Sequence, residues 1–388
     1  MALLKDSLSR IKPSATMAVT DKARALKAAG RDVIGLGAGE PDFDTPDNVR
    51  DAAKRALDDG WTHYGPPLGL PALREAIAAD ATARKGFAAS PDRVVVTPGA
   101  KPIMYYAIET LVEPGVEVIF PDPGFPIYES MTRFCGGTPV RLPIRQEHDF
   151  RIDLDELERL ITPRTRLLIL NSPANPTGGL FTRADVERIG ELVLRHDLTV
   201  LADEIYGRIV YEGEHVSLAS LPGLAERTIV LDGFSKTYAM TGWRLGYAIV
   251  PEPLLGPFSL MIINSVSCTS SFSQLAAVEA LTGPQDAVEA MVEEFRARRT
   301  LIVDGLNAIP GITCRMPAGA FYAFPDVSET GLDGPAIAER LLDETGVCVL
   351  SGTAFGQIGR DHIRISYANS RENLTEALGR IRTFVEAL

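Results

Sequence analysis

The sequence predicts an α/β protein, in which a large domain with a mostly parallel central sheet covered by helices is joined to a smaller α+β domain. Three features support this prediction. Short apolar, β-branched runs recur from about residue 90 to 250, amphipathic stretches separate them, and the pattern changes after about residue 284. Short runs without alternation are typical of strands buried on both faces, as in a helix-covered parallel sheet.

The predicted strands and helices alternate along the chain. Thr182 and Asp185 have the spacing of a helix capping box, and Asp153 precedes a second apolar helical stripe. Such alternation gives a layered fold with right-handed crossovers, in which ligands bind outside the carboxyl ends of the strands. The strand-like runs are Val94–Thr97, Val116–Phe120, Leu167–Leu170, Leu198–Leu201, Thr228–Leu231 and Gly246–Val250.

The smaller domain is expected where the pattern changes. A long helical stripe from Val288 to Val303 leads into two shorter strand-like segments, Gly319–Phe324 and His362–Ser366. We expect residues 46–284 to form the large domain, and residues 1–45 to join 285–388 in the small one.

Composition narrows the possible partners. The net charge of −12 and the acidic balance argue against a nucleic-acid surface, which needs basic groups to displace counterions. The four cysteines form no CxxC pair, so neither a metal site nor a disulfide framework is expected. Lys5 and Asp6 place charges where a signal peptide would have its apolar stretch, and no uncharged apolar run approaches the roughly 20 residues needed to span a membrane. We expect a cytoplasmic protein that binds neither nucleic acid nor membranes.

Polar motifs follow four of the predicted strands, at the edge where a ligand should bind. They are Gly99-Ala100-Lys101, Asn175-Pro176-Thr177-Gly178, Asp203-Glu204-Ile205-Tyr206, and Gly233-Phe234-Ser235-Lys236 with Arg244 eight residues further on. In this order and spacing, the set resembles the class I and II aminotransferases, which have the pyridoxal-5'-phosphate (PLP) fold type I. The likeness runs from the segment around Ser14 to Arg364, and is strongest to the bacterial aspartate aminotransferases of the prokaryotic subgroup.

The resemblance implies PLP as cofactor and assigns roles around its ring. Lys236 would hold PLP and act as general base, because a buried lysine beside other cations loses basicity. Asp203 would keep the pyridine nitrogen protonated, since a neighbouring carboxylate raises that nitrogen's pKa. Tyr206 and Asn175 would contact the phenolate oxygen. Phe125 would stack on the ring, with an ordinary core phenylalanine as the alternative.

The resemblance also implies a phosphate site and a substrate site. A helix that opens directly after a strand offers backbone N–H groups to a phosphate, and an arginine adds a bidentate contact. The implied phosphate residues are Gly99, Ala100, Lys101, Gly233, Ser235 and Arg244, with Tyr64 reaching the phosphate of a neighbouring subunit. Many family members have serine at the position of Gly233, so that hydroxyl contact is missing here.

For the substrate, Arg364 would grip the α-carboxylate, with the Gly39 backbone and Asn175 beside it. Lys101, Ser14 and Thr16 resemble positions that meet a dicarboxylic side chain. The implied enzyme is a homodimer with shared active sites, whose partners are an amino acid and a 2-oxo acid.

The expected reaction is ping-pong transfer of the amino group of an L-amino acid, with aspartate and glutamate as candidates, to a 2-oxo acid. The alternative is another PLP reaction on the same scaffold: β- or γ-elimination, replacement or ring formation. A PLP-sensing transcription regulator is disfavoured, because only about 30 residues precede the first motif. A scaffold without catalysis is disfavoured by the presence of Lys236, Asp203 and Tyr206.

Overall fold

The computed structural model describes residues 5–11 and 15–388 and has a seven-stranded sheet at its centre. The sheet is parallel except for β8, which runs antiparallel to both of its neighbours, β2 and β7. In spatial order the strands are β2 (Val94–Thr97), β8 (Gly246–Ile249), β7 (Thr228–Gly233), β6 (Thr199–Asp203), β5 (Thr165–Asn171), β3 (Glu117–Asp122) and β4 (Thr138–Pro143). The predicted mostly parallel sheet is therefore confirmed.

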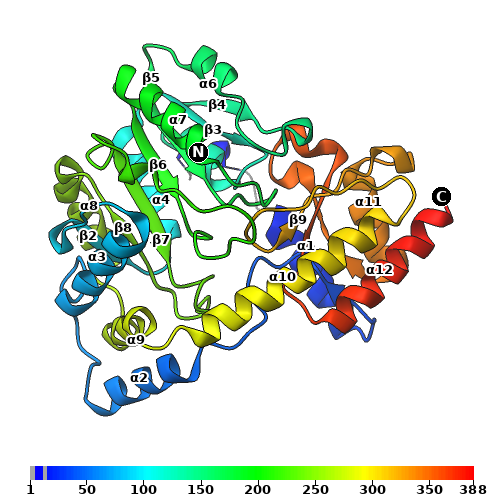
Figure 1. Cartoon of the computed structure of the whole chain (residues 1–388), viewed down its shortest axis with the longest axis horizontal. Helices are drawn as coiled ribbons and strands as arrows, with labels where there is room; N and C mark the ends of the chain where they lie inside the picture. The colour runs from blue at the N-terminus through cyan, green and yellow to red at the C-terminus, as the bar shows by residue number, and fades with distance from the viewer. Residues whose placement is uncertain (1–4, 12–14) are drawn as a thin grey trace.

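Helices cover both faces of this sheet (Figure 1). On β2 the side chains alternate between two cores: Val94 and Val96 belong to one apolar cluster and Val95 to another. Both faces of the strand are consequently apolar from Val94 to Val96. The covering helices are α2 (Asp47–Asp58), α3 (Pro71–Lys85), α4 (Lys101–Leu111), α5 (Ile127–Phe134), α6 (Leu154–Leu160), α7 (Arg183–Arg195), α8 (Glu252–Ser265) and α9 (Ser271–Thr282).

The predicted helix starts at Asp153 and Thr182 are confirmed. Asp153 accepts a hydrogen bond from the backbone N–H of Glu156, and Thr182 and Asp185 form a reciprocal capping box. Strand β4 was not predicted. It lies at the edge of the sheet, is largely half-buried or exposed, and contains two prolines, so it lacks the continuous apolar run of the interior strands.

The remaining part of the chain is built around a second apolar core. A three-stranded antiparallel sheet has the order β11 (Leu350–Ser351), β12 (Ile363–Ser366), β9 (Tyr322–Ala323), and β1 (Ile34–Gly35) pairs in parallel with β10 (Val347–Cys348). The helices here are α1 (Ala15–Ala28), α11 (Gly334–Arg340) and α12 (Arg371–Glu386).

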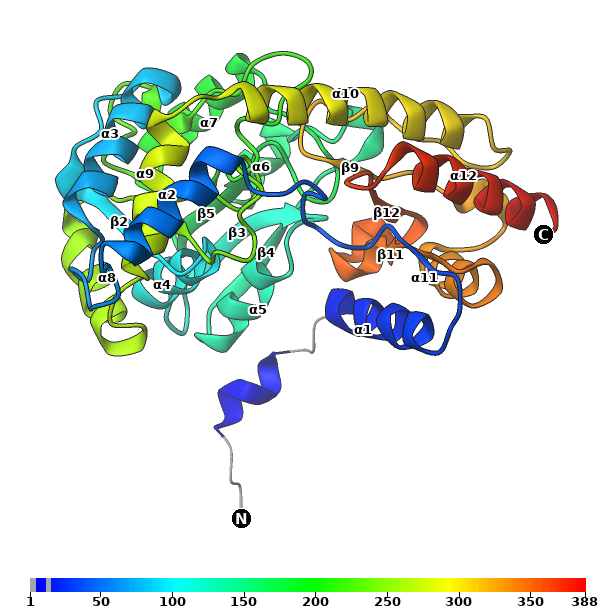
Figure 2. The same cartoon turned by 90° about the horizontal axis from the view of Figure 1, so that it is seen from below.

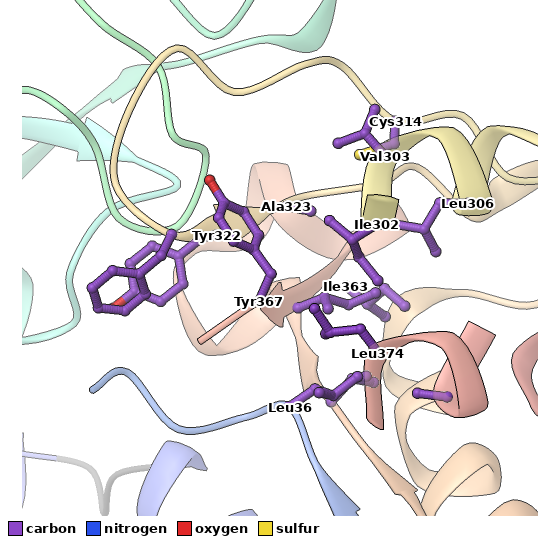
Figure 3. Packing of buried hydrophobic residues seen from close by; sticks show 14 of the residues in the cluster. Leu36, Ile302, Val303, Leu306, Cys314, Tyr322, Ala323, Ile363, Tyr367 and Leu374 are labelled. Carbon is purple, nitrogen blue, oxygen red and sulfur yellow. The ribbon is translucent and has the colours of Figure 1, made fainter. Parts of the chain in front are cut away.

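Segments far apart in the sequence meet in this second core. Figure 3 shows Leu36, Ile302 and Leu374 packed together with Ile363. Each fully buried side chain of this kind contributes about 1.5–3 kcal/mol relative to exposure. The core thus ties the N-terminal segment to the C-terminal one.

One long helix, α10 (Asp286–Asn307), links the two cores. Its first turn places Val288 in a core of the large sheet, whereas Phe295 and Ile302 belong to the second core. Figure 2 shows the helix extending from the side of the large sheet to α12. The predicted domain boundaries at residues 46 and 284 stay a prediction.

Candidate active site

Three neighbouring parallel strands end at the same edge of the large sheet and carry the predicted motifs. Strand β6 pairs with β5 through Asn171 and Asp203, and with β7 through Asp203 and Leu231. The loops after β5 and β7 carry Asn175 and Lys236. Because their carboxyl ends are aligned, the strands bring together residues that are distant in the sequence.

Lys236 and Arg364 converge on one short backbone segment. The Lys236 Nζ donates a hydrogen bond of 2.5 Å to the carbonyl oxygen of Gly39. Two residues earlier, the Gly37 carbonyl oxygen accepts a hydrogen bond of 2.6 Å from Arg364 Nη2. The pKa of Lys236 is lowered to about 8, chiefly by burial; the charge of Glu40 opposes this shift, and the charges of Arg364 and Arg244 contribute to it. This amine is therefore a better nucleophile and base near neutral pH than an ordinary lysine.

Asp203 is buried and held by a tyrosine that the sequence did not predict. Its Oδ2 accepts a 2.7 Å hydrogen bond from Tyr128 Oη, and its Oδ1 accepts a 3.3 Å bond from the N–H of Ile205. Burial raises the pKa of Asp203 to about 6; the hydrogen bonds from Tyr128 and Ile205 limit this rise, and the charges of Asp232 and Glu204 add to it. The carboxyl group is ionised at neutral pH and suited to pair with a cation.

Tyr206 and Arg364 are joined by a second unpredicted tyrosine, Tyr322. The hydroxyl groups of Tyr206 and Tyr322 lie 2.7 Å apart, and the Arg364 guanidinium lies 4.4 Å from the centre of the Tyr322 ring. A Cβ on Gly39 would come within 2.8 Å of the Tyr322 hydroxyl, so the lack of a side chain at Gly39 leaves room for it. Tyr322 thus touches three predicted site residues.

The Arg364 side chain is only 2% exposed, and burial lowers its pKa. Its Nη1 donates a 3.0 Å hydrogen bond to Asn175 Oδ1, but its Nε has no hydrogen-bond partner within the described residues. Because no carboxylate among the described residues pairs with this buried guanidinium and one of its N–H groups lacks a partner there, it is suited to bind an anionic ligand.

Three of the predicted phosphate residues, Gly99, Ala100 and Lys101, lie at the start of α4. Gly99 has φ of +83°, and a Cβ there would lie 2.3 Å from Arg244 Nη2, so only glycine permits this close approach of backbone and guanidinium. Ala100 is the residue before the first turn of α4; a helix start offers backbone N–H groups to an anion, although here Pro102 has none and the N–H of Ile103 donates to the Ala100 carbonyl oxygen. Gly233, the last residue of β7, and Ser235, in the loop that leads to Lys236, are both buried.

The less buried candidates form what we call the rim of the site: Phe125, Lys101, Arg244 and Tyr64. Phe125 is half-buried, with its ring 5.9 Å from the ring of Tyr128 and 5.5 Å from Lys101 Nζ. Lys101 is exposed, and Tyr64 is 92% exposed, so neither belongs to the buried cluster. Thr16 lies half-buried in α1, and Ser14 falls outside the described residues.

Tyr128 and Tyr322 are the site residues that sequence reasoning missed. Both lie in apolar stretches, where a fully buried tyrosine must find a partner for its hydroxyl group. A tyrosine in such a stretch therefore indicates that its hydroxyl group has a hydrogen-bonding partner, but the sequence does not identify that partner.

The described part of the chain contains neither a cluster suited to a metal ion nor a helix suited to a membrane. No group of histidine, cysteine, aspartate or glutamate residues is arranged to hold a metal ion there. Among the same residues, no helix has both the length and the apolar character required to cross a bilayer.

Comparison with known proteins gives long matches at high identity. A family model described as aminotransferase class I and II matches residues 31–381. An aspartate/prephenate aminotransferase of Cereibacter sphaeroides is 45% identical, with 100% of each chain covered. An aspartate aminotransferase of Geobacillus stearothermophilus is 41% identical over 99% of each. Among solved structures, the aspartate aminotransferase of Thermus thermophilus with maleate is 40% identical over the full length of both chains, with a TM-score of 0.94.

Proposed function

Because the chain belongs to the class I and II aminotransferases, we propose that it transfers the amino group of an acidic L-amino acid to a 2-oxo acid through PLP held by Lys236. One observation carries this proposal. The Lys236 amine and the Arg364 guanidinium are hydrogen-bonded to carbonyl groups only two residues apart, at Gly39 and Gly37. An α-amino acid carries its amino and carboxylate groups on one carbon, so a lysine-held cofactor and a carboxylate-binding arginine must lie this close together.

The residues present fit PLP. A glycine cradle beside the Arg244 guanidinium and the start of α4 suits a phosphate, and a Cβ on Gly99 would fill that cradle. Asp203 is suited to pair with a protonated ring nitrogen, and Tyr206 and Asn175 are suited to contact a phenolate oxygen. Phe125 offers an aromatic face on which the cofactor ring can stack. When bound, PLP supplies the electron sink that accepts the electron pair left at the substrate Cα.

The protein's own groups bind, orient and move the proton. Arg364 fixes the α-carboxylate with a bidentate fork, and this holds the Cα–H bond in one orientation. The Lys236 Nζ takes the proton from Cα, and its pKa of about 8 allows it to take up and return a proton near neutral pH. Asp203 keeps its negative charge and so maintains the proton on the ring nitrogen. The same groups serve an amino acid in one half-reaction and a 2-oxo acid in the other.

For the side chain of the substrate we propose Lys101 as the cation that meets a second carboxylate. Its ammonium group is exposed and lies 5.5 Å from the centre of the ring of Phe125, which we propose as a contact of the cofactor ring. The relatives named for aspartate and for aspartate/prephenate support an acidic substrate.

We further propose a homodimer in which Tyr64 completes the neighbour's phosphate site. A tyrosine that is 92% exposed contributes little to its own chain, and its loop is fixed because Ser271 Oγ donates a 3.1 Å hydrogen bond to the carbonyl oxygen of His63. A fixed, exposed tyrosine suits a contact made between subunits.

A half-reaction screen tests the proposed function. The PLP-loaded enzyme is mixed with one amino acid at a time, without a 2-oxo acid, while the absorbance of the bound cofactor and the products are followed. We expect aspartate and glutamate to react fastest and to give one 2-oxo acid per site without ammonia. Continuous release of ammonia would instead support elimination chemistry.

A further inference from the structure

A second buried charge cluster lies beside Asp203. Lys85, the last residue of α3, has its Nζ 2.7 Å from Glu204 Oε2 and 2.8 Å from Asp232 Oδ2. Its side chain is only 7% exposed. Burial disfavours the ammonium form, but the carboxylates of Asp232 and Glu204 outweigh this and raise the pKa of Lys85. One cation therefore serves two buried carboxylates.

The two carboxylates are fully engaged with their surroundings. Glu204 Oε1 accepts a 2.6 Å hydrogen bond from Ser217 Oγ, and its Oε2 lies 3.1 Å from Nε2 of His215. Asp232 Oδ1 accepts a 2.7 Å bond from the N–H of Gly233. Neither carboxylate can turn toward solvent without breaking several contacts, so its charge must be balanced where it lies.

The cluster sits on the strand ends that carry the proposed cofactor groups. Glu204 directly follows Asp203 at the end of β6, and its N–H donates a 2.9 Å bond to the Leu231 carbonyl oxygen of β7. Asp232 lies on β7, four residues before Lys236. Lys85 therefore bridges the ends of β6 and β7, the two strands that carry Asp203 and lead into the Lys236 loop.

We propose that Lys85 is a positioning residue for PLP, which acts through Asp203 by balancing the charges of Glu204 and Asp232. This inference rests on the proposed function of Asp203 as the partner of the ring nitrogen. Without Lys85, Asp232 loses its cation and Glu204 keeps only His215 beside it, so two poorly compensated carboxylates remain near a third, and like charges disfavour ionisation.

The electrostatic situation of Asp203 supports the inference. Burial already raises its pKa to about 6, and the charges of Asp232 and Glu204 act in the same direction. Loss of the Lys85 cation strengthens their effect, so that Asp203 takes up a proton near neutral pH and can no longer pair with a protonated ring nitrogen. The other ionisable groups that interact with Asp203 are Tyr128 from α5, Tyr206 after β6, Lys236 after β7 and Tyr322 of β9.

Charge-balance rescue tests the proposal. The dissociation constant of PLP is measured on apoenzymes of the wild type, Lys85→Met, Asp232→Asn and the double variant, together with the thermal unfolding of each apoenzyme. Lys85→Met should weaken PLP binding by about tenfold or more, because it leaves buried charges unpaired. The double variant has the same net charge in the cluster as the wild type, and we expect its affinity to return to within about threefold of the wild type. Lys85→Gln takes the place of Lys85→Met if the methionine variant does not fold.

A second comparison separates action through Asp203 from a general structural role. In an Asp203→Asn background, Lys85→Met should cause no further loss of PLP affinity, because the group through which Lys85 acts is already neutral. Unchanged PLP binding in Lys85→Met, no rescue in the double variant, or a full further loss in the Asp203→Asn background would each overturn the proposal. A wild-type apoenzyme that does not bind PLP would instead refute the proposed function.

Discussion

The buried strand ends and the exposed rim of the candidate site are built in different ways. At the strand ends, Asp203, Tyr206 and Arg364 are at most 4% exposed and contact partners within the same chain. At the rim, Lys101 and Arg244 are exposed and Tyr64 is almost wholly so. The difference teaches that the fold itself orients the buried groups, whereas the function that we propose assigns the exposed groups further partners in ligands or in a second subunit.

Burial also determines how far the pKa of each group is shifted. It raises the pKa of Asp203 to about 6 and lowers that of Lys236 to about 8, so the two values approach each other across neutral pH. Exposed charges are screened by water and interact weakly. Substitutions at the strand ends should therefore affect every substrate, and those at the rim should depend on substrate or assembly.

The largest effect is expected for Lys236→Ala. Loss of both the cofactor tether and the general base should lower kcat/KM by on the order of 10⁴-fold or more. Lys54→Ala, which changes an exposed lysine of α2, is the matched control and should leave the rate unchanged. Steady-state kinetics measure both, and a Lys236→Ala enzyme with a tenth of the wild-type rate would contradict the assignment.

The next largest effect is expected for Asp203→Asn. The amide is nearly isosteric but cannot keep the ring nitrogen protonated, so we expect PLP to remain bound and Cα proton removal to slow by on the order of a thousandfold. Single-turnover absorbance measurements give this rate. Asp92→Asn, at an exposed carboxylate, serves as control, and a normal rate in Asp203→Asn would refute the role of Asp203.

Lys101→Ala sharpens the comparison, because its effect should depend on the substrate. In the complex that we propose, the bound substrate covers Lys101 and excludes water from the charge pair. Losing this partner of the side-chain carboxylate should then cost about 2–5 kcal/mol in kcat/KM for aspartate and glutamate, with little change for alanine and leucine. An equal loss for all four amino acids, together with weaker PLP retention, would assign Lys101 to the phosphate instead.

Tyr64→Ala tests whether the rim is completed by a second subunit. Loss of a hydrogen bond to a charged phosphate should weaken PLP binding by about 1.5–3 kcal/mol. Mixing impaired Tyr64→Ala with inactive Lys236→Ala subunits should restore activity, since each hybrid dimer contains one intact site. Absence of recovery in hybrids shown to have formed would count against shared sites.

The smallest effect is expected for Tyr128→Phe. Asp203 loses its 2.7 Å donor, so the pKa of Asp203 rises above about 6 and PLP affinity falls by about 1–2 kcal/mol. The loss should grow as the pH falls from 8 to 6, because the ionised form of Asp203 disappears as the pH drops through its raised pKa. Tyr106→Phe removes a buried hydroxyl group that contacts Ser265 and should show no such trend.

The sequence predicted the interior strands because burial on both faces leaves an apolar run, and it missed β4 because an edge strand tolerates proline and polar residues. The site motifs were predicted because each follows a strand end and their order resembles one family. Tyr128, Tyr322 and Lys85 were not predicted, since their partners lie 75, 116 and 119 residues away in the sequence. Only the folded structure shows which tyrosines and lysines contact a carboxylate or a phenol group.

The central claim is that Lys236 holds PLP, and one labelling measurement tests it directly. Borohydride reduction of the PLP-loaded wild type fixes the cofactor to the amine that holds it, and peptide mapping by mass spectrometry then locates the label. The label is expected on the peptide that contains Lys236, at one per chain. A label on Lys85, Lys101 or any other lysine in its place, or no label at all, would contradict the claim.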